Sequence, residues 1–116
     1  MGNGFSIAQS ETFKADVKVP VTNADGKREE RKFKAIFARL SAEELKDLGE
    51  QMEKGEVTHR QFCDRVLRGW EAVEGEDGGP LIYNPDNVVR LLNVYPVATC
   101  LVNSFLEAVG GARVKN

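Results

Sequence analysis

The residues best spaced for nucleophilic chemistry are His59 and Cys63, which lie four positions apart in a segment with helical periodicity. Side chains at that spacing share one face of a helix, so an imidazole could activate a thiol there. However, His59 is expected in the first turn of the helix beside Arg60, and Cys63 falls on the apolar stripe. The pattern therefore favours an exposed histidine and a buried thiol, and we predict no catalytic residue.

Metal and phosphate chemistry also lack a suitable residue pattern. A zinc site needs four ligands at recognisable spacing, and the sequence offers only Cys63, Cys100 and His59. The carboxylates of Glu74–Asp77 do not follow the alternating order of a calcium loop. Gly75–Gly79 does not lie between a strand and a helix as a phosphate-binding loop would. We expect no metal, no cofactor and no enzymatic activity.

Composition narrows the class of protein further. The chain has 116 residues, of which 41% are hydrophobic and 29% charged, and its net charge is −2. These values are typical of one globular domain. The basic stretch Lys27–Lys34 contains Glu29 and Glu30, which suits a solvated strand edge better than a nucleic-acid site. No apolar run approaches the ~20 residues of a membrane span, so neither nucleic acid nor a membrane is an expected partner.

Residues 1–10 are rich in Gly, Asn and Ser and predict a flexible N-terminal arm. Residues 11–40 then predict an antiparallel β-hairpin, because apolar and polar side chains alternate from Phe13 to Val21. Asp25-Gly26 supplies the turn, and the second strand runs to Leu40. Pro20 cannot donate to a ladder and belongs near an edge.

Residues 41–112 predict about four short helices. Ser41–Glu44 and Thr58–Gln61 are capping boxes that begin the first two, and the apolar face of the second is expected to continue through Trp70 to Val73. Asn84-Pro85 begins the third helix and Pro96 precedes the fourth, which should stop at Gly110-Gly111. Strands followed by helices indicate an α+β fold, with residues 11–116 forming a single domain.

Exposed aromatic residues are the best candidates for function once catalysis is set aside. Tyr83 and Tyr95 stand beside Pro and Asn residues at expected helix ends, where a side chain is often half exposed. Aromatic side chains of this kind concentrate binding energy at interfaces. Reasoning from the residues alone thus leads to a small α+β domain that works by binding a partner.

The order of elements and several segments resemble the phage tail assembly chaperone family over nearly the whole chain. The resemblance rests on Thr12–Val17, Phe33–Phe37, Leu40–Glu44, Val66–Trp70, the Gly-rich acidic turn, Pro80–Asn87, Leu91-Leu92, Tyr95-Pro96, Phe105–Ala108 and Gly111–Asn116. It implies a protein that binds the helical tape measure protein, keeps it soluble and helps recruit major tail tube subunits. It also implies action in the cytoplasm of the bacterial host and absence from the mature virion.

The resemblance implies no catalytic residue, and we expect partner binding at the third and fourth helices and their junction. The predicted binding residues are Tyr83, Leu92, Val94, Tyr95 and Val109. The Val-rich hairpin could also pair with the edge of a second copy, so self-association is possible.

Many members of this family have a longer form made by ribosomal frameshifting. Lys115-Asn116 can be encoded by a slippery run if the codon of Val114 ends in A, which predicts such a form here.

Two other readings stay open. The chain could be a small structural protein of the tail or of the head–tail connector, which would remain in the virion. It could also be a generic bacterial adaptor domain without a viral link.

Overall fold

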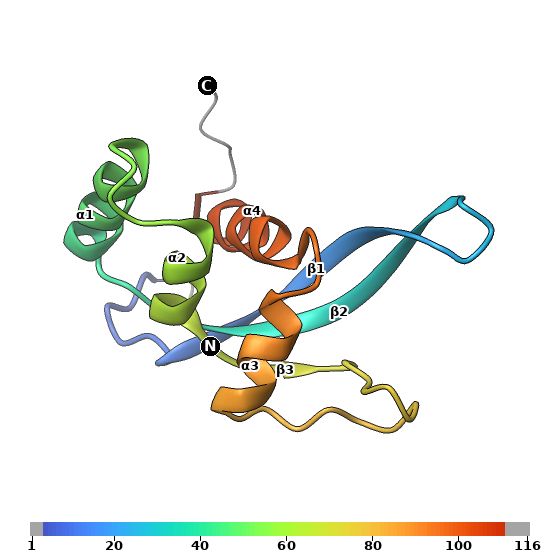
Figure 1. Cartoon of the computed structure of the whole chain (residues 1–116). Helices are drawn as coiled ribbons and strands as arrows, with labels where there is room; N and C mark the ends of the chain where they lie inside the picture. Colours follow the sequence, from blue (N-terminus) through green and yellow to red (C-terminus); the bar gives the residue numbers. More distant parts are fainter. Residues whose placement is uncertain (1–3, 111–116) are drawn as a thin grey trace.

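The computed structural model describes residues 4–110 and shows an α+β fold, as predicted. Within these residues, three antiparallel strands in the order β1-β2-β3 form one sheet, and four helices pack with it (Figure 1). Residues 4–11 precede the first strand and form neither helix nor strand. The elements are β1 (Thr12–Thr22), β2 (Arg28–Ala38), α1 (Ala42–Glu53), α2 (His59–Val66), β3 (Leu67–Glu71), α3 (Pro85–Leu92) and α4 (Val97–Gly110).

The predicted hairpin is confirmed, with β1 and β2 in register from Thr12 opposite Ala38 to Thr22 opposite Arg28. Asn23 organises its turn, because its side-chain oxygen accepts hydrogen bonds from the backbone of Asp25 and Lys27. Gly26 has a φ of +80°, a conformation that glycine adopts without a steric cost. The strands alternate as expected, and the buried face carries Val17, Val19, Phe33, Ala35 and Phe37.

The prediction that the second helix continues to Val73 is wrong. α2 ends at Val66, and the backbone of Leu67 is extended, with φ −79° and ψ 127°. The following five residues pair with β2 as β3. Gly69 allows this pairing, since a Cβ on it would lie 3.2 Å from the Cδ1 atom of Ile36. The helical spacing of Leu67 and Trp70 was misleading, because a register shift in this pairing also leaves both side chains buried.

The predicted helix starts are confirmed at the level of individual hydrogen bonds. The Ser41 hydroxyl accepts from the backbone of Glu44, whose carboxylate accepts in return from the backbone of Ser41. Thr58 and Gln61 repeat the arrangement at α2. These reciprocal bonds satisfy donors that a helix N-terminus otherwise leaves unpaired.

The third and fourth helices also begin where the sequence indicates. Asn84 caps α3 with Pro85 in its first turn, and α4 follows Pro96. The structure describes α4 as far as Gly110, so the second residue of the expected Gly110-Gly111 stop and the Lys115-Asn116 ending lie outside the described residues.

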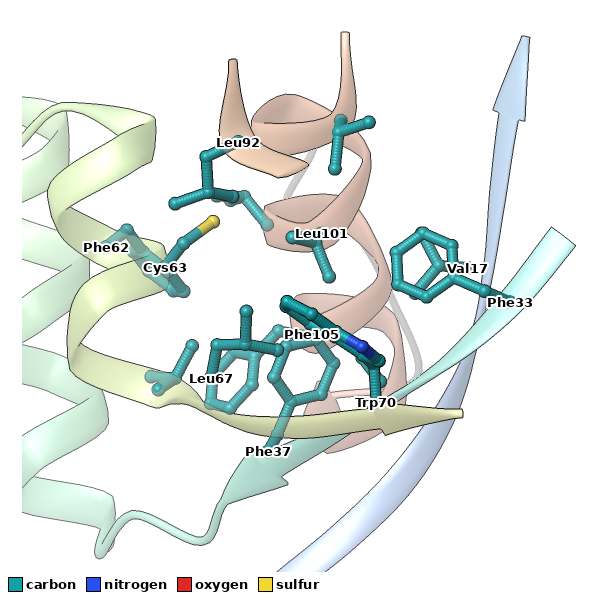
Figure 2. Packing of buried hydrophobic residues seen from close by; sticks show 14 of the residues in the cluster. Val17, Phe33, Phe37, Phe62, Cys63, Leu67, Trp70, Leu92, Leu101 and Phe105 are labelled. Atoms are coloured by element: carbon teal, nitrogen blue, oxygen red, sulfur yellow. The ribbon is translucent and has the colours of Figure 1, made fainter. Parts of the chain in front are cut away.

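The core lies between α4 and the inner face of the sheet, with α2 closing one side (Figure 2). Phe105 of α4 is fully buried, and its ring centroid lies 5.2 Å from that of Phe37 and 5.5 Å from that of Phe62. Phe13 contacts the same ring at 5.8 Å. Aromatic side chains from both strands of the hairpin and from α2 therefore converge on one residue of the last helix.

The junction of α3 and α4 is a sharp bend of 99°. Two backbone hydrogen bonds hold it, from the amide of Val94 to the carbonyl of Leu91 and from the amide of Val97 to the carbonyl of Val94. Among the helices of residues 4–110, none alone is long and apolar enough to cross a membrane. α3 and α4 meet that requirement only when they are counted together across the bend.

Candidate partner-binding surface

The α3–α4 junction places two apolar side chains on the surface. Leu92 and Val97, on either side of the turn, are buried and anchor it to the core. Val94 and Tyr95 lie between them and are 49% and 89% exposed. A tyrosine with almost its whole side chain in water makes little contribution to its own fold but offers a large surface to a partner.

A hollow, here called the junction groove, opens beside Val94 and has a volume of about 380 Å³. Three parts of the chain enclose it: the distal half of the hairpin, the loop after β3, and the α3–α4 junction. Its lining residues are Val19, Val21, Arg31, Lys32, Phe33, Ala72, Val73, Glu74, Gly75, Leu91, Val94 and Val97.

Two further hollows share Val94 with the junction groove. One, of about 500 Å³, lies between Pro20–Thr22 of the hairpin and Tyr95. The other, of about 270 Å³, lies between the loop after β3 and Leu91. Val94 lines all three hollows, which together make up a mainly apolar depression with residues 19–22 of the hairpin on one side. The hairpin extends beyond the helices (Figure 1).

Charged side chains lie on two sides of this depression, on the hairpin and on the loop after β3. On the hairpin, Arg31 pairs with Glu29 at 2.8 Å, and hydrogen bonds from Asn23 and Arg31 lower the pKa of the Glu29 carboxyl. On the loop after β3, Glu76 pairs with Arg90 of α3, and this hydrogen bond lowers the pKa of Glu76. The second pair links the loop after β3 to α3.

The structure brings together only some of the predicted binding residues. Val94 and Tyr95 are adjacent at the groove, and Leu92 is 7% exposed and belongs to the core. Tyr83 packs edge-on against Trp70, and its hydroxyl donates to the carbonyl of Leu67. Val109 lies near the other end of α4 and lines a separate hollow with Phe13 and Leu45. Their role in partner binding stays a prediction.

The sequence pattern alone did not identify the hairpin side of this depression as part of a binding surface, although a signal for it is present. Val19 and Val21 continue the apolar face of β1 towards the turn, where Val19 is buried and Val21 is half-buried. The period-two alternation of apolar residues along this segment indicated a half-buried strand. That they face the α3–α4 junction follows only from the tertiary structure.

The His59–Cys63 pair does not form. The Nδ1 atom of His59 lies 2.9 Å from the hydroxyl of Thr99, whereas the Cys63 thiol donates to the carbonyl of Ala98. Cys63 is fully buried, and this burial raises the pKa of its thiol to about 12. A thiol with that pKa is almost entirely protonated at neutral pH and is a poor nucleophile.

Within the part of the chain that the structure describes, no group of three or more His, Cys, Asp or Glu side chains could hold a metal ion. The features that stand out are instead an apolar depression and an exposed tyrosine beside it. Fold and surface together define a small α+β protein with a candidate surface for binding another macromolecule.

Comparison with known proteins assigns the chain to a particular family. The profile of the phage tail assembly chaperone family matches residues 1–116, the whole chain, so the protein belongs to this family and acts in phage tail assembly. Searches of curated proteins and of solved structures found no match. Family membership agrees with a non-enzymatic role and with phage tail proteins as partners.

Proposed function

We propose that this chaperone binds the tape measure protein, keeps it soluble before the tail tube encloses it, and helps bring major tail tube subunits to it. The observation that carries the proposal is the apolar depression around Val94 and Tyr95 in a member of the tail assembly chaperone family. It would act in the cytoplasm of the bacterial host and be absent from the mature virion.

The physical argument concerns exposed apolar surface. A long helical protein that later lines a tube presents apolar stripes before assembly, and such stripes aggregate. A groove with an apolar floor can receive the apolar face of a helix, as in other helix-in-groove complexes. The exposed ring of Tyr95 at the rim would contact the same helix from the side. Tube polymerisation can then displace the chaperone without a nucleotide.

Co-expression with the tape measure protein from the same phage or prophage tests this proposal. We expect the tape measure protein to be soluble and to co-purify with the wild-type chaperone, and to be insoluble without it. Equal solubility in both cases, with no co-purification, would overturn the proposal. Detection of the chain in purified virions would favour a structural tail or connector protein instead.

The longer frameshifted form is tested at the gene. A slippery run spanning the codons of Val114 to Asn116, followed by an overlapping reading frame, is the expected finding. A Val114 codon that does not end in A removes this slippery run and this part of the proposal.

A further inference from the structure

Half of β2 has an open edge on the side of the junction groove. β3 pairs only with Lys34–Phe37 and ends at Glu71. Ala72 then has a φ of +67°, a conformation that a residue with a Cβ rarely adopts, and the chain turns away from the sheet. Among the described strands, residues 28–33 therefore pair with β1 alone. An open edge presents backbone donors and acceptors that can bind another strand.

The space that β3 leaves is the junction groove itself. Arg31, Lys32 and Phe33 of the open edge line it on one side, and Ala72–Gly75 line it on the other. Successive side chains of a strand point to opposite faces. A strand added at this edge would thus place every second side chain over the apolar floor formed by Leu91 and Val94, and the others in solvent.

The arm before β1 has the pattern that this groove requires. Phe5 and Ile7 are two positions apart and are 84% and 92% exposed, and among the large apolar residues that the structure describes only Tyr95, at 89%, is comparably exposed. Small residues, Ser6 and Ala8, alternate with them. An arm with two apolar side chains at strand spacing in water is a candidate for strand addition.

The arm also lacks any positive charge that the basic open edge of β2 would repel. The arm and the start of β1, residues 4–13, contain no Lys or Arg, and their one charged side chain is Glu11. The open edge carries Arg28, Arg31 and Lys32. Arg31 is paired with Glu29, but none of the ion pairs between described residues involves Arg28 or Lys32.

The arm is too short to reach the groove of its own chain. The carbonyl of Glu11 accepts a hydrogen bond from the amide of Arg39, which fixes the base of the arm beside the end of β2. From there, four residues to Ile7 span at most about 14 Å. The eight residues from Arg39 back to Arg31 cover about 26 Å of strand. The occupant must come from a second copy.

We propose that residues 4–10 of one copy add as an antiparallel strand to the open edge of β2 in a second copy. Continuing the line of β3 places Phe5 opposite Phe33, Ser6 opposite Lys32 and Ile7 opposite Arg31. The same register puts Glu11 opposite Lys27, which suits its charge. Two copies can exchange arms reciprocally around a two-fold axis, which closes the assembly as a dimer. In the dimer the arm fills the junction groove, so a tail protein binds at the hollow between Pro20–Thr22 and Tyr95 or displaces the arm.

Sedimentation and light scattering over a range of concentrations test the exchange in the full chain. We expect the wild type to form a dimer of twice the 12.8 kDa chain mass. The double variant Phe5→Ser/Ile7→Ser should raise the dimer dissociation constant by roughly 100-fold or more, because two apolar side chains lose their burial. Ala8→Ser is the matched control, because the side chain of residue 8 would lie on the face of the added strand opposite to Phe5 and Ile7. A wild type that stays monomeric, or a double variant that dimerises like the wild type, would overturn the proposal.

A disulfide test identifies the register. A chain with Ser6→Cys is mixed with a differently tagged chain with Lys32→Cys and oxidised. Lys54→Cys, just after the end of α1, is the control position, and the wild type is the blank for the natural cysteines. We expect a mixed disulfide between the two differently tagged chains when the second carries Lys32→Cys, and none above the blank when it carries Lys54→Cys. Equal yields at the two positions would place the arm elsewhere and refute the exchange.

Discussion

Replacing Tyr95 by Ala should separate binding from folding more cleanly than any other single change. The Tyr95 side chain is 89% exposed, so its removal leaves the core intact. Surface substitutions of this kind change the free energy of unfolding by less than about 0.5 kcal/mol. We therefore expect the urea midpoint of Tyr95→Ala to match that of the wild type.

The expected loss of binding follows from the same exposure. A tyrosine side chain buries about 150–250 Å² when it is fully covered, which corresponds to an upper limit of roughly 4–6 kcal/mol at about 25 cal/mol per Å². Truncation of an aromatic residue near the centre of an interface typically costs about 2 kcal/mol or more. Such a loss raises the dissociation constant of the complex about 30-fold.

The assay is biolayer interferometry against fragments of the tape measure protein that are fused to a solubilising carrier. Ile82→Ala is the matched control, because Ile82 is 72% exposed but lines none of the three hollows that share Val94. An affinity of Tyr95→Ala within about twofold of the wild type, when the wild type itself binds, would refute the placement of the binding surface at the α3–α4 junction. Binding would then lie on another face, such as the hollow beside Val109.

Three further predictions concern the fold. Phe105→Ala removes a fully buried ring and should lower the free energy of unfolding by about 3–5 kcal/mol in urea titrations; a loss below about 1 kcal/mol would contradict its central place in the core. Ala72→Gly should raise the free energy of unfolding by about 0.5–1 kcal/mol, since relief of the left-handed conformation outweighs the added chain entropy, and destabilisation would show that the Ala72 methyl group matters more. Burial of Cys63 raises its thiol pKa to about 12, so the folded protein holds this proton more tightly than the unfolded chain, and the associated stability is complete below about pH 9 and falls as the pH rises towards 12. Urea titrations at pH 8 and pH 10.5 should therefore show a smaller loss for Cys63→Ala than for the wild type, and equal losses would contradict the raised pKa.

Local signals were sufficient for most of the secondary structure. Asp25-Gly26 marked the hairpin turn, and two capping boxes marked the starts of α1 and α2. Asn84-Pro85 marked the start of α3. Each of these signals acts between residues at most a few positions apart, so the sequence carries the cause of the structure directly.

The one element that was predicted wrongly, the extension of the second helix to Val73, shows what local sequence patterns cannot decide. Leu67 and Trp70 fit the apolar face of a longer helix as well as they fit a strand. Pairing with β2 decides between helix and strand here, because β2 forms hydrogen bonds with β3 and its Ile36 contacts Gly69. No periodicity within residues 59–73 contains that information, because the deciding partner lies about thirty residues earlier in the chain.

For the candidate site, too, some features could be predicted from the sequence and others depend on the tertiary structure. The sequence by itself indicated a binding protein and the family that it resembles, and it led to the prediction that Val94 and Tyr95 at a helix junction bind a partner. Only the tertiary structure placed Leu92 in the core, separated Val109 from the junction, and brought Val21 and Arg31 of the hairpin to face Val94. A groove forms between elements that are distant in the chain, and its walls depend on how strands and helices pack. Residue types can therefore suggest a binding function, but packing decides which of those residues share a surface.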